Sequence, residues 1–244
     1  MIKIENVTKQ FGKDKIAVNN ANWTLPEGSI TGYIGPNGAG KTTTMKMITG
    51  VLKPDSGRIL INDIDVAKNP LEAKKQFGFV SDTPDNFLHL KAIEYLNFMG
   101  DVYEVSAPER ETFISAYAKR FEIEDSLGER IINFSHGMRQ KVMVMGALIH
   151  SPSIWILDEP LTGLDPQASY QLKEMMREHA KSGKSVLFST HVLDTAEKLC
   201  DNIVIIRKGE IVYQGDLESL KTKYQDDTSL EKIFLEITED EKNN

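Results

Sequence analysis

The segment Gly35 to Thr43, GPNGAGKTT, has the residue types and spacing of a phosphate-binding loop. Its glycines let successive backbone N–H groups turn toward phosphate oxygens, and the start of the following helix adds its positive dipole end. Lys41 would neutralise the β- and γ-phosphates, and the Thr42 hydroxyl would hold Mg²⁺. The alternative, a glycine-rich turn with a chance lysine, is disfavoured because a strand-like run precedes the segment and a helical run follows it. The residues predicted to form the loop are Gly35, Pro36, Asn37, Gly38, Ala39, Gly40, Lys41, Thr42 and Thr43.

Two carboxylates follow the apolar run SIWIL, residues 153 to 157. Asp158, at the predicted end of a strand, is placed to reach Mg²⁺ directly or through water. Glu159 would extend beside the γ-phosphate, where it could orient or deprotonate an attacking water. The alternative is the start of a surface loop with two solvated acids. The apolar run immediately before the acids favours the metal and water roles.

Apolar runs and their breakers predict an α/β architecture with a helical insertion. Several runs, such as Ile154 to Leu157 and Val186 to Phe188, are apolar without alternation, which is typical of strands covered on both faces in a parallel sheet. A largely helical stretch is predicted from about Lys91 to His150. The predicted strands are residues 2–7, 29–34, 57–62, 77–80, 153–158, 185–190 and 202–207.

Length and composition narrow the class of protein. The 244 residues suffice for one α/β domain with a subdomain or for two small domains. The formal net charge of −7 counts against a dedicated nucleic-acid binder, and the single cysteine, Cys200, excludes disulfides within the chain. No run approaches the roughly 18 consecutive apolar residues of a membrane-spanning helix, and the N-terminus lacks the apolar stretch of a signal peptide. The sequence therefore predicts a soluble chain whose membrane role, if it has one, depends on a partner.

The segment FSHGMRQK, residues 134 to 141, predicts the start of a helix. The Ser135 hydroxyl can accept a hydrogen bond from one of the first N–H groups of the helix, as an N-cap does. Gly137 follows two residues later, and glycine weakens a first helical turn unless something must approach the backbone closely. A group that approaches this turn is therefore a second interpretation beside the plain N-cap.

Taken in order, the motifs GPNGAGKTT, FSHGM, ILDEP, LTGLD and STH resemble the ATP-binding cassette family of ATPases, and their style most resembles bacterial exporter subunits. The resemblance covers about the first 215 residues. It implies a P-loop NTPase core with a mostly parallel sheet, an N-terminal antiparallel β-subdomain and a helical subdomain at about residues 85–150. On this basis residues 1–220 form the ATPase domain, and residues 221–244 form a C-terminal helix and an acidic tail.

In that family, the segment that matches Ser135 to Met138 caps the γ-phosphate of ATP held by the other cassette. Two cassettes would then enclose two ATP molecules, so that ATP binding favours a closed dimer and hydrolysis reopens it. The usual family sequence is LSGGQ, from which Phe134, His136 and Met138 depart here. Ser135 and Gly137 remain. His136 is interpreted as a solvated side chain, the alternative being a pH-dependent charge near phosphate.

Four further residues match family positions. Phe11 matches an aromatic residue that stacks on adenine, with ordinary burial at a strand end as the alternative. His191 matches the switch histidine that contacts the γ-phosphate, and Asp165 matches the loop that crosses to the opposite cassette while also suiting a helix N-cap. Asp82 stands where the family has a glutamine that contacts Mg²⁺ and water; its charged oxygen suits the metal, but it is one methylene shorter.

The resemblance implies an ATPase that uses ATP and Mg²⁺ and drives a transporter, in particular an exporter of peptides, drugs or similar compounds. Its implied partners are transmembrane subunits on separate chains and a second cassette, identical or related, at the cytoplasmic face of the membrane; no nucleic acid is expected. One alternative is a soluble cassette ATPase that acts on nucleic acid or ribosomes, although such proteins typically carry tandem cassettes, a coiled-coil insertion or zinc modules. A small-molecule phosphotransferase is another, but it leaves FSHGM and LTGLD unexplained.

Two regions carry structural predictions only. Leu230, Ile233 and Ile237 recur at helical spacing in the tail, which predicts a helix that packs on its own domain. His150 and His179 have no motif around them and are predicted to lie at the surface.

Overall fold

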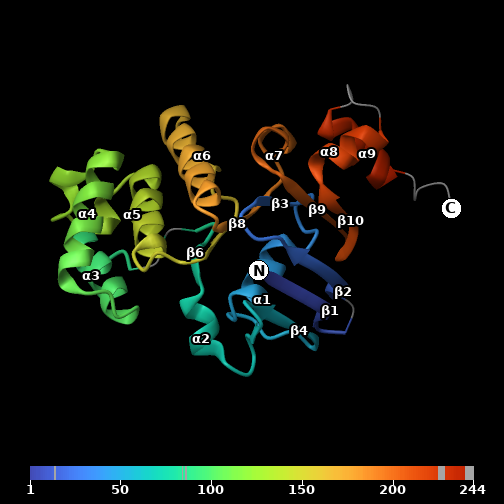
Figure 1. The fold of residues 1–244 in the computed structure, drawn as a ribbon, viewed down its shortest axis with the longest axis horizontal. Coiled ribbons are helices and arrows are strands. Elements are labelled where there is room, and N and C mark those ends of the chain that lie inside the picture. Colours follow the sequence, from blue (N-terminus) through green and yellow to red (C-terminus); the bar gives the residue numbers. More distant parts are fainter. Residues whose placement is uncertain (14, 84, 86, 225–228, 240–244) are drawn as a thin grey trace.

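The computed structural model describes residues 1–13, 15–83, 85, 87–224 and 229–239 (Figure 1). Its central sheet has six strands in the order β10-β9-β3-β8-β7-β6, and every pair is parallel except β9 with β10. The strands are β3 (Ile30–Ile34), β6 (Phe77–Val80), β7 (Ile154–Leu157), β8 (Ser185–Thr190), β9 (Asn202–Arg207) and β10 (Glu210–Asp216).

The parallel strands are buried on both faces, as their unbroken apolar runs predict. Every residue of β3, β7 and β8 is buried. Because these strands run in the same direction, their carboxyl ends meet at one edge of the sheet, which is where open α/β sheets bind ligands. This edge carries the segments that follow β3, β6, β7 and β8.

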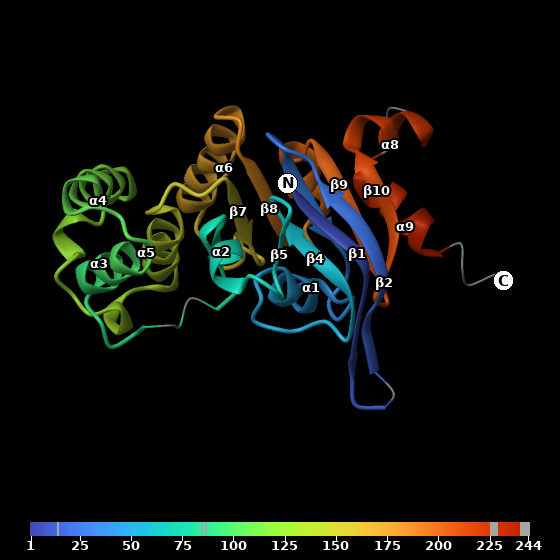
Figure 2. The same cartoon turned by 60° about the horizontal axis from the view of Figure 1, so that its bottom comes forward.

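A second sheet is antiparallel, with the order β2-β1-β4-β5. Its strands are β1 (Ile2–Phe11), β2 (Lys15–Leu25), β4 (Ser56–Ile61) and β5 (Ile64–Asp65). β1 and β2 extend together beyond β4 (Figure 2). The antiparallel N-terminal sheet and the α/β class implied by the resemblance are therefore confirmed.

The seven predicted strands are present, whereas β2, β5 and β10 were not predicted. β2 contains Asn20 at a φ of 44°, and its register with β1 shifts along the pair, so its apolar residues do not alternate regularly. β10 lies at the edge of the sheet with no fully buried residue, and its apolar run, Ile211 to Tyr213, is short; β5 has only two residues.

The predicted helical stretch forms the helices α3 (Ala92–Val102), α4 (Ala107–Phe121) and α5 (His136–Leu148), with 3₁₀ turns at Glu124–Ser126 and Ile131–Asn133. These helices lie together at one end of the molecule, away from the antiparallel sheet (Figure 1). The remaining helices are α1 (Lys41–Ile48), α2 (Pro70–Lys75), α6 (Pro166–Lys181), α7 (Leu193–Leu199), α8 (Leu217–Lys223) and α9 (Leu230–Glu239).

Alternate residues of the central strands enter two different cores. Ile154 and Ile156 pack with Met45 of α1 and with the antiparallel sheet, whereas Trp155 and Leu157 pack with α3, α5 and α6 on the other face. α1 is thus held between the two sheets. The packing fixes both ends of the helix that follows the phosphate loop.

α9 packs on its own domain as predicted, since Leu230 and Ile233 are fully buried and α9 contacts α7. The acidic residues 240–244 lie outside the described residues. None of the described helices is both long and apolar enough to cross a membrane.

The prediction that His150 and His179 lie at the surface is wrong. Both side chains are half-buried, and the His150 ring stacks on Tyr103 with a centroid distance of 3.6 Å. This contact could not be predicted from the sequence, because Tyr103 follows the end of α3 and His150 follows the end of α5, and the two meet only in the folded chain.

Candidate active site

The phosphate loop joins β3 to α1, and its conformation requires glycine. Gly40 has a φ of 116°, and a Cβ there would lie 2.4 Å from the Ala17 carbonyl oxygen. Gly40 is also the N-cap of α1, so no side chain competes for the first N–H groups of the helix. The Gly209 N–H donates to the Ala39 carbonyl at 2.9 Å and ties the back of the loop to the β9–β10 turn. The loop can therefore present backbone donors to an anion.

The Lys41 side chain is buried and turns back along the loop. Its Nζ donates to the Gly35 carbonyl at 2.8 Å and to the Pro36 carbonyl at 3.3 Å. The same ammonium lies 3.2 Å from Glu159 Oε1, so it is partnered by oxygen atoms on several sides. Phosphate oxygens are the same kind of partner, which makes this ammonium suited to a nucleotide.

Asp158 follows β7 and is 1% exposed. The Ser189 hydroxyl of the neighbouring strand donates to its carboxylate, and Thr42 also hydrogen-bonds to it. Burial raises the pKa of Asp158, and these two hydrogen bonds oppose that rise. The adjacent oxygens of Asp158 and Thr42 fit a hard cation such as Mg²⁺, which is bound in proteins by one or two oxygen side chains together with phosphates and water.

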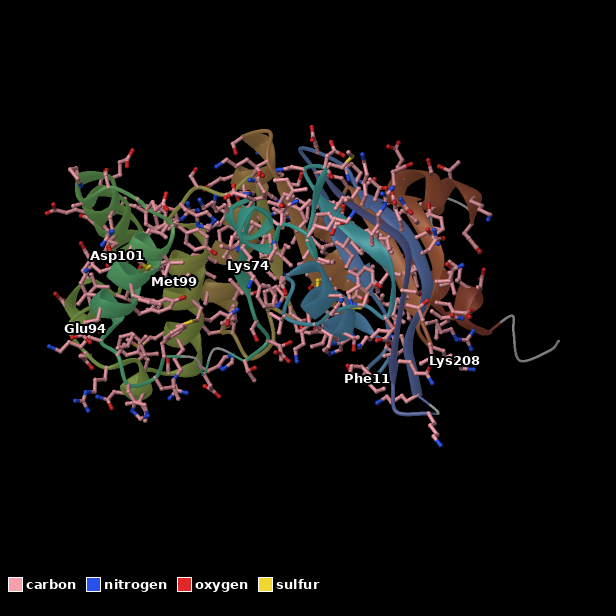
Figure 3. All side chains as sticks on the ribbon, turned by 90° about the horizontal axis from the view of Figure 1, so that it is seen from below. Phe11, Lys74, Glu94, Met99, Asp101 and Lys208 are labelled. Carbon is pink, nitrogen blue, oxygen red and sulfur yellow. The ribbon has the colours of Figure 1, made fainter. Side chains whose placement is uncertain are left out.

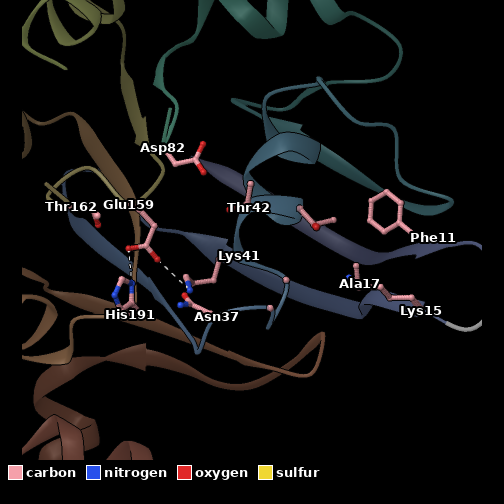
Figure 4. Close-up of a pocket in the computed structure, with 13 residues that line it drawn as sticks. Phe11, Lys15, Ala17, Asn37, Lys41, Thr42, Asp82, Glu159, Thr162 and His191 are labelled. Carbon is pink, nitrogen blue, oxygen red and sulfur yellow. Dashed lines mark hydrogen bonds and ion pairs between the residues drawn. The ribbon is translucent and has the colours of Figure 1, made fainter. Parts of the chain in front are cut away.

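Glu159 is held between two nitrogen atoms at the entrance to the loop (Figure 4). Its Oε2 lies 2.9 Å from His191 Nδ1, while Oε1 faces Lys41. Its backbone has a φ of 47°, and its N–H donates to the Ser189 hydroxyl at 2.9 Å. Ser189 therefore fixes both acidic residues that follow β7. Its hydroxyl proton is donated to the Asp158 carboxylate, and its hydroxyl oxygen accepts from the Glu159 N–H.

These groups line a pocket with a volume of about 410 Å³ at the carboxyl edge of the sheet. Of the predicted site residues, the pocket brings together Phe11, Asn37, Gly38, Gly40, Lys41, Thr42, Thr43, Asp82, Glu159 and His191. Gly35, Pro36 and Ala39 belong to the loop but do not line the pocket, and Asp158 lies beneath it. The sequence reading missed Lys15, Ala17 and Thr162, which also line it. Lys15 could have been found as the cross-strand neighbour of Phe11, and Thr162 as part of the turn after Glu159.

Phe11 and Asp82 stand on different sides of the pocket (Figure 4). The Phe11 ring is 43% exposed, so the alternative of ordinary burial at a strand end is wrong. Lys9 Nζ lies 5.7 Å from the ring centroid, and the exposed ring lines the pocket, where an aromatic ring can stack on a planar group. Asp82 is exposed, and its Oδ1 accepts from the hydroxyls of Ser81 and Thr83.

A family model described as ABC transporter matches residues 18–162, which is more than half of the chain. The chain belongs to the ABC transporter family. It is 36% identical over 242 residues to the ABC-type transporter ATP-binding protein EcsA of Bacillus subtilis, covering 99% of this chain and 98% of that protein. It is 34% identical over 214 residues to Nod factor export ATP-binding protein I of Burkholderia lata, covering 88% of this chain and 70% of the relative.

Solved structures agree with this membership. The structure of an ATP-binding subunit of an ABC transporter has a TM-score of 0.92 at 32% identity, and the match covers 98% of this chain and 99% of that one. A dimeric ATP-binding cassette in a post-hydrolysis state, bound to ADP and phosphate, has a TM-score of 0.79 at 26% identity over 89% of this chain and 99% of that one. The predicted cassette fold is therefore confirmed, and the chain is an ATPase.

In this ABC transporter ATPase, the segment Ser135 to Met138 lies outside the pocket of its own chain. The structure describes all four residues of this segment, and none of them lines the pocket. Ser135 is the N-cap of α5 as predicted, since its hydroxyl accepts from the Met138 N–H at 3.3 Å. A Cβ at Gly137 would meet only Leu164, at 3.8 Å, so the backbone of this turn is open to approach.

The loop after Glu159 packs beside that turn. A Cβ at Gly163 would lie 3.3 Å from the ring of His136, which is exposed. Asp165 is the N-cap of α6 as predicted, accepting from the Ala168 N–H at 2.9 Å. Asp165 is also exposed and does not line the pocket of its own chain.

Proposed function

We propose that this chain is the ATP-hydrolysing motor of an exporter whose membrane-spanning subunits are separate chains. The observation that carries the proposal is the separation of two parts of an ATP site. Lys41, Glu159 and His191 line one pocket, whereas the Ser135 turn of the same chain is exposed elsewhere. A γ-phosphate held in the pocket would therefore be covered by the Ser135 turn of a second cassette.

Within one chain, we assign Glu159 as the base that activates water and Lys41 as the principal phosphate ligand. A triphosphate competes with Glu159 for the Lys41 ammonium, and the released carboxylate is then able to accept a proton from water. His191 holds the other carboxylate oxygen and orients it, and its exposed ring can reach the γ-phosphate. All three of these side chains already line the pocket.

The oxygen atoms of Thr42 and Asp158 are the proposed holders of Mg²⁺, together with Asp82, whose carboxylate lies near Thr42 (Figure 4) and whose charge helps to raise the pKa of Asp158. When bound, the ion neutralises phosphate charge as the terminal bond breaks. Among the described residues, no cluster of three or more His, Cys, Asp or Glu is placed to hold a metal ion.

At the other end of the pocket, Phe11 is the proposed platform for adenine. Phe11 is the last residue of β1, and its ring lies away from Glu159 and Asp82 in the pocket (Figure 4). Lys15 on β2 pairs directly with Phe11 and lines the same end, where its ammonium can face the ribose or α-phosphate.

A closed dimer follows from this arrangement. Two chains related head to tail would each add Ser135, His136, Gly137 and Met138 to the ATP of the other, and Asp165 would lie in the loop that crosses between them. Binding then favours closure, and loss of the γ-phosphate removes the group that both chains hold. The second cassette is an identical or a related chain.

The membrane role is inferred from the relatives of this chain. Relatives carry names such as Nod factor export and linearmycin resistance ATP-binding protein. We infer attachment at the cytoplasmic face of the membrane, an export direction, and a cargo chosen by the membrane subunits. We also divide the chain into the ATPase domain, residues 1–220 with its helical subdomain at about 85–150, and the C-terminal segment 221–244.

Copurification tests this function. The tagged chain is extracted from its own cells in a mild detergent, and the bound chains are identified by mass spectrometry. Membrane-spanning subunits should copurify, and their addition should raise the ATPase rate. Recovery of ribosomes or of nucleic acid with a salt-sensitive affinity, without any membrane chain, would instead support a soluble cassette.

A further inference from the structure

A second pocket lies where the last turn of α1 meets β4, β5 and the start of α2. Its volume is about 470 Å³, within the range of small-molecule sites. It contains none of the nucleotide-site residues. Its apolar lining comes from Met47, Leu52, Pro54, Ile59, Val66 and Pro70.

Apolar surface continues from this lining to the solvent. Val51, between two lining residues, is 67% exposed, and Leu71, which follows Pro70, is 74% exposed. These are large exposed fractions for aliphatic side chains. Such surface beside a concave, apolar lining is typical of a ligand site.

The charge around the pocket is positive although the chain as a whole carries −7. The lining contains three cations, Lys53, Arg58 and Lys68, against one carboxylate, Asp65, which leaves a net charge of two positive. The Asp65 carboxylate is already used, since it accepts from the N–H groups of Ala67 and Lys68 at 2.9 and 3.1 Å.

The cations are not equally available. Arg58 is paired with Glu5, and Lys68 Nζ lies 3.8 Å from Asp65. Within the part of the chain that the structure describes, no hydrogen bond or ion pair engages the ammonium of Lys53 or of Lys74. Lys74 stands on α2 (Figure 3), and its Cε lies 3.9 Å from where a Cβ of the lining residue Gly50 would be.

We propose that this pocket binds a small amphiphilic anion: an apolar body packs against Met47 and Val66, and a single negative headgroup lies at Lys53 with Lys74 nearby. A phosphate or another wholly polar anion would leave the apolar lining uncovered. A neutral apolar compound would gain nothing from the two free ammonium groups. An apolar body and a negative headgroup on one molecule satisfy both features.

Octanoate is a suitable probe, and the Met47 methyl group is a reporter inside the pocket. Protein with ¹³C-methyl methionine is titrated with octanoate, and the Met47 signal is assigned with Met47→Leu. We expect the Met47 signal to shift saturably, and 1-octanol to bind more weakly. Lys53→Gln should weaken octanoate binding about two- to fivefold, the range of one exposed ion pair, whereas the control Lys181→Gln on α6 should not.

A blocking variant gives a second, independent test. Ala67 lines the pocket and is exposed, so Ala67→Phe should fill the pocket without disturbing the fold. Octanoate should then no longer shift Met47, while ATP still binds. An unmoved Met47 signal in the parent chain, equal affinity for octanoate and octanol, or unchanged binding in Lys53→Gln would overturn the proposal. None of these outcomes depends on the proposed transport role.

Discussion

At the scale of single residues, the site depends on how Glu159 is held. Its two carboxylate oxygens face Lys41 and His191, and its backbone N–H is fixed by Ser189. The side chain is 16% exposed, so its charge acts in a partly desolvated place. Removing the charge of Lys41 should therefore weaken nucleotide binding, whereas removing the charge of Glu159 should impair hydrolysis and leave binding intact.

Lys41→Ala removes the ammonium that faces the phosphates. We expect nucleotide affinity to fall, with the loss of turnover that follows from it, because charge-assisted contacts to phosphate are among the strongest in a site. Titration with a fluorescent ATP analogue and a steady-state ATPase assay measure the two effects. Unchanged activity would remove the argument for the phosphate loop. Lys46→Ala, on the exposed side of the same helix, is the matched control.

Glu159→Gln keeps the shape of the side chain but removes its basicity. We expect kcat to fall about 10²- to 10⁴-fold, the usual contribution of a general base, with ATP still bound. Single-turnover ATPase assays and a binding titration on the same preparation give both numbers. Steady-state hydrolysis at the parent rate would show that another group activates the water.

At the scale of elements, α5 connects the Ser135 turn to the helical subdomain through close packing. A Cβ at Gly146 would lie 2.4 Å from the hydroxyl oxygen of Tyr95, a residue of α3 that is 4% exposed. Gly146 therefore sets the distance between the two helices.

Gly146→Ala should lower the free energy of unfolding by about 1–2 kcal/mol, because overpacking outweighs the gain in helix propensity. Chemical denaturation followed by circular dichroism measures it. Gly128→Ala in the same subdomain, where a Cβ would meet no atom within 4 Å, should have little effect. Equal stability of the two variants would mean that α3 and α5 can separate at no cost.

Elements with a strong local pattern could be predicted from the sequence. Unbroken apolar runs predicted the buried parallel strands. Short local motifs predicted the glycine loop, the two acids after β7, and the N-caps Ser135 and Asp165. The edge strand β10 and the irregular β2 carry no such pattern. Ser189 was missed because its role arises from neighbouring strands that meet only in the folded chain. Lys15 and Thr162 are local neighbours of Phe11 and Glu159 and could have been found from the hairpin and the turn that contain them.

At the scale of the whole molecule, two half-buried histidines link stability to pH. Burial lowers the pKa of His150 and of His179 to about 4, with the nearby positive charge of Lys184 contributing to both. In the unfolded chain each has a pKa near 6.5. Between these values only the unfolded chain binds the protons, so the free energy of unfolding should fall as the pH decreases from about 6.5 toward 4.

Urea denaturation at a series of pH values measures this slope. Replacing His150 with Phe, which can still stack on Tyr103, should reduce the slope, while the same substitution at the exposed His89 should not. Carboxylates contribute to the slope in every variant, so the comparison between the two replacements is the informative quantity. An identical slope in both would show that His150 accepts its proton in the folded chain as readily as in the unfolded one.

The central claim, also at this scale, is that each ATP is bound by the pocket of one chain and covered by the Ser135 turn of another. Light scattering coupled to size-exclusion chromatography tests it on Glu159→Gln with Mg·ATP. We expect twice the chain mass with ATP and the single-chain mass without it, and we expect that adding Ser135→Arg abolishes the dimer while the pocket still binds ATP. An ATP-loaded Glu159→Gln chain that stays monomeric at high concentration, or a dimer that is indifferent to Ser135→Arg, would contradict it.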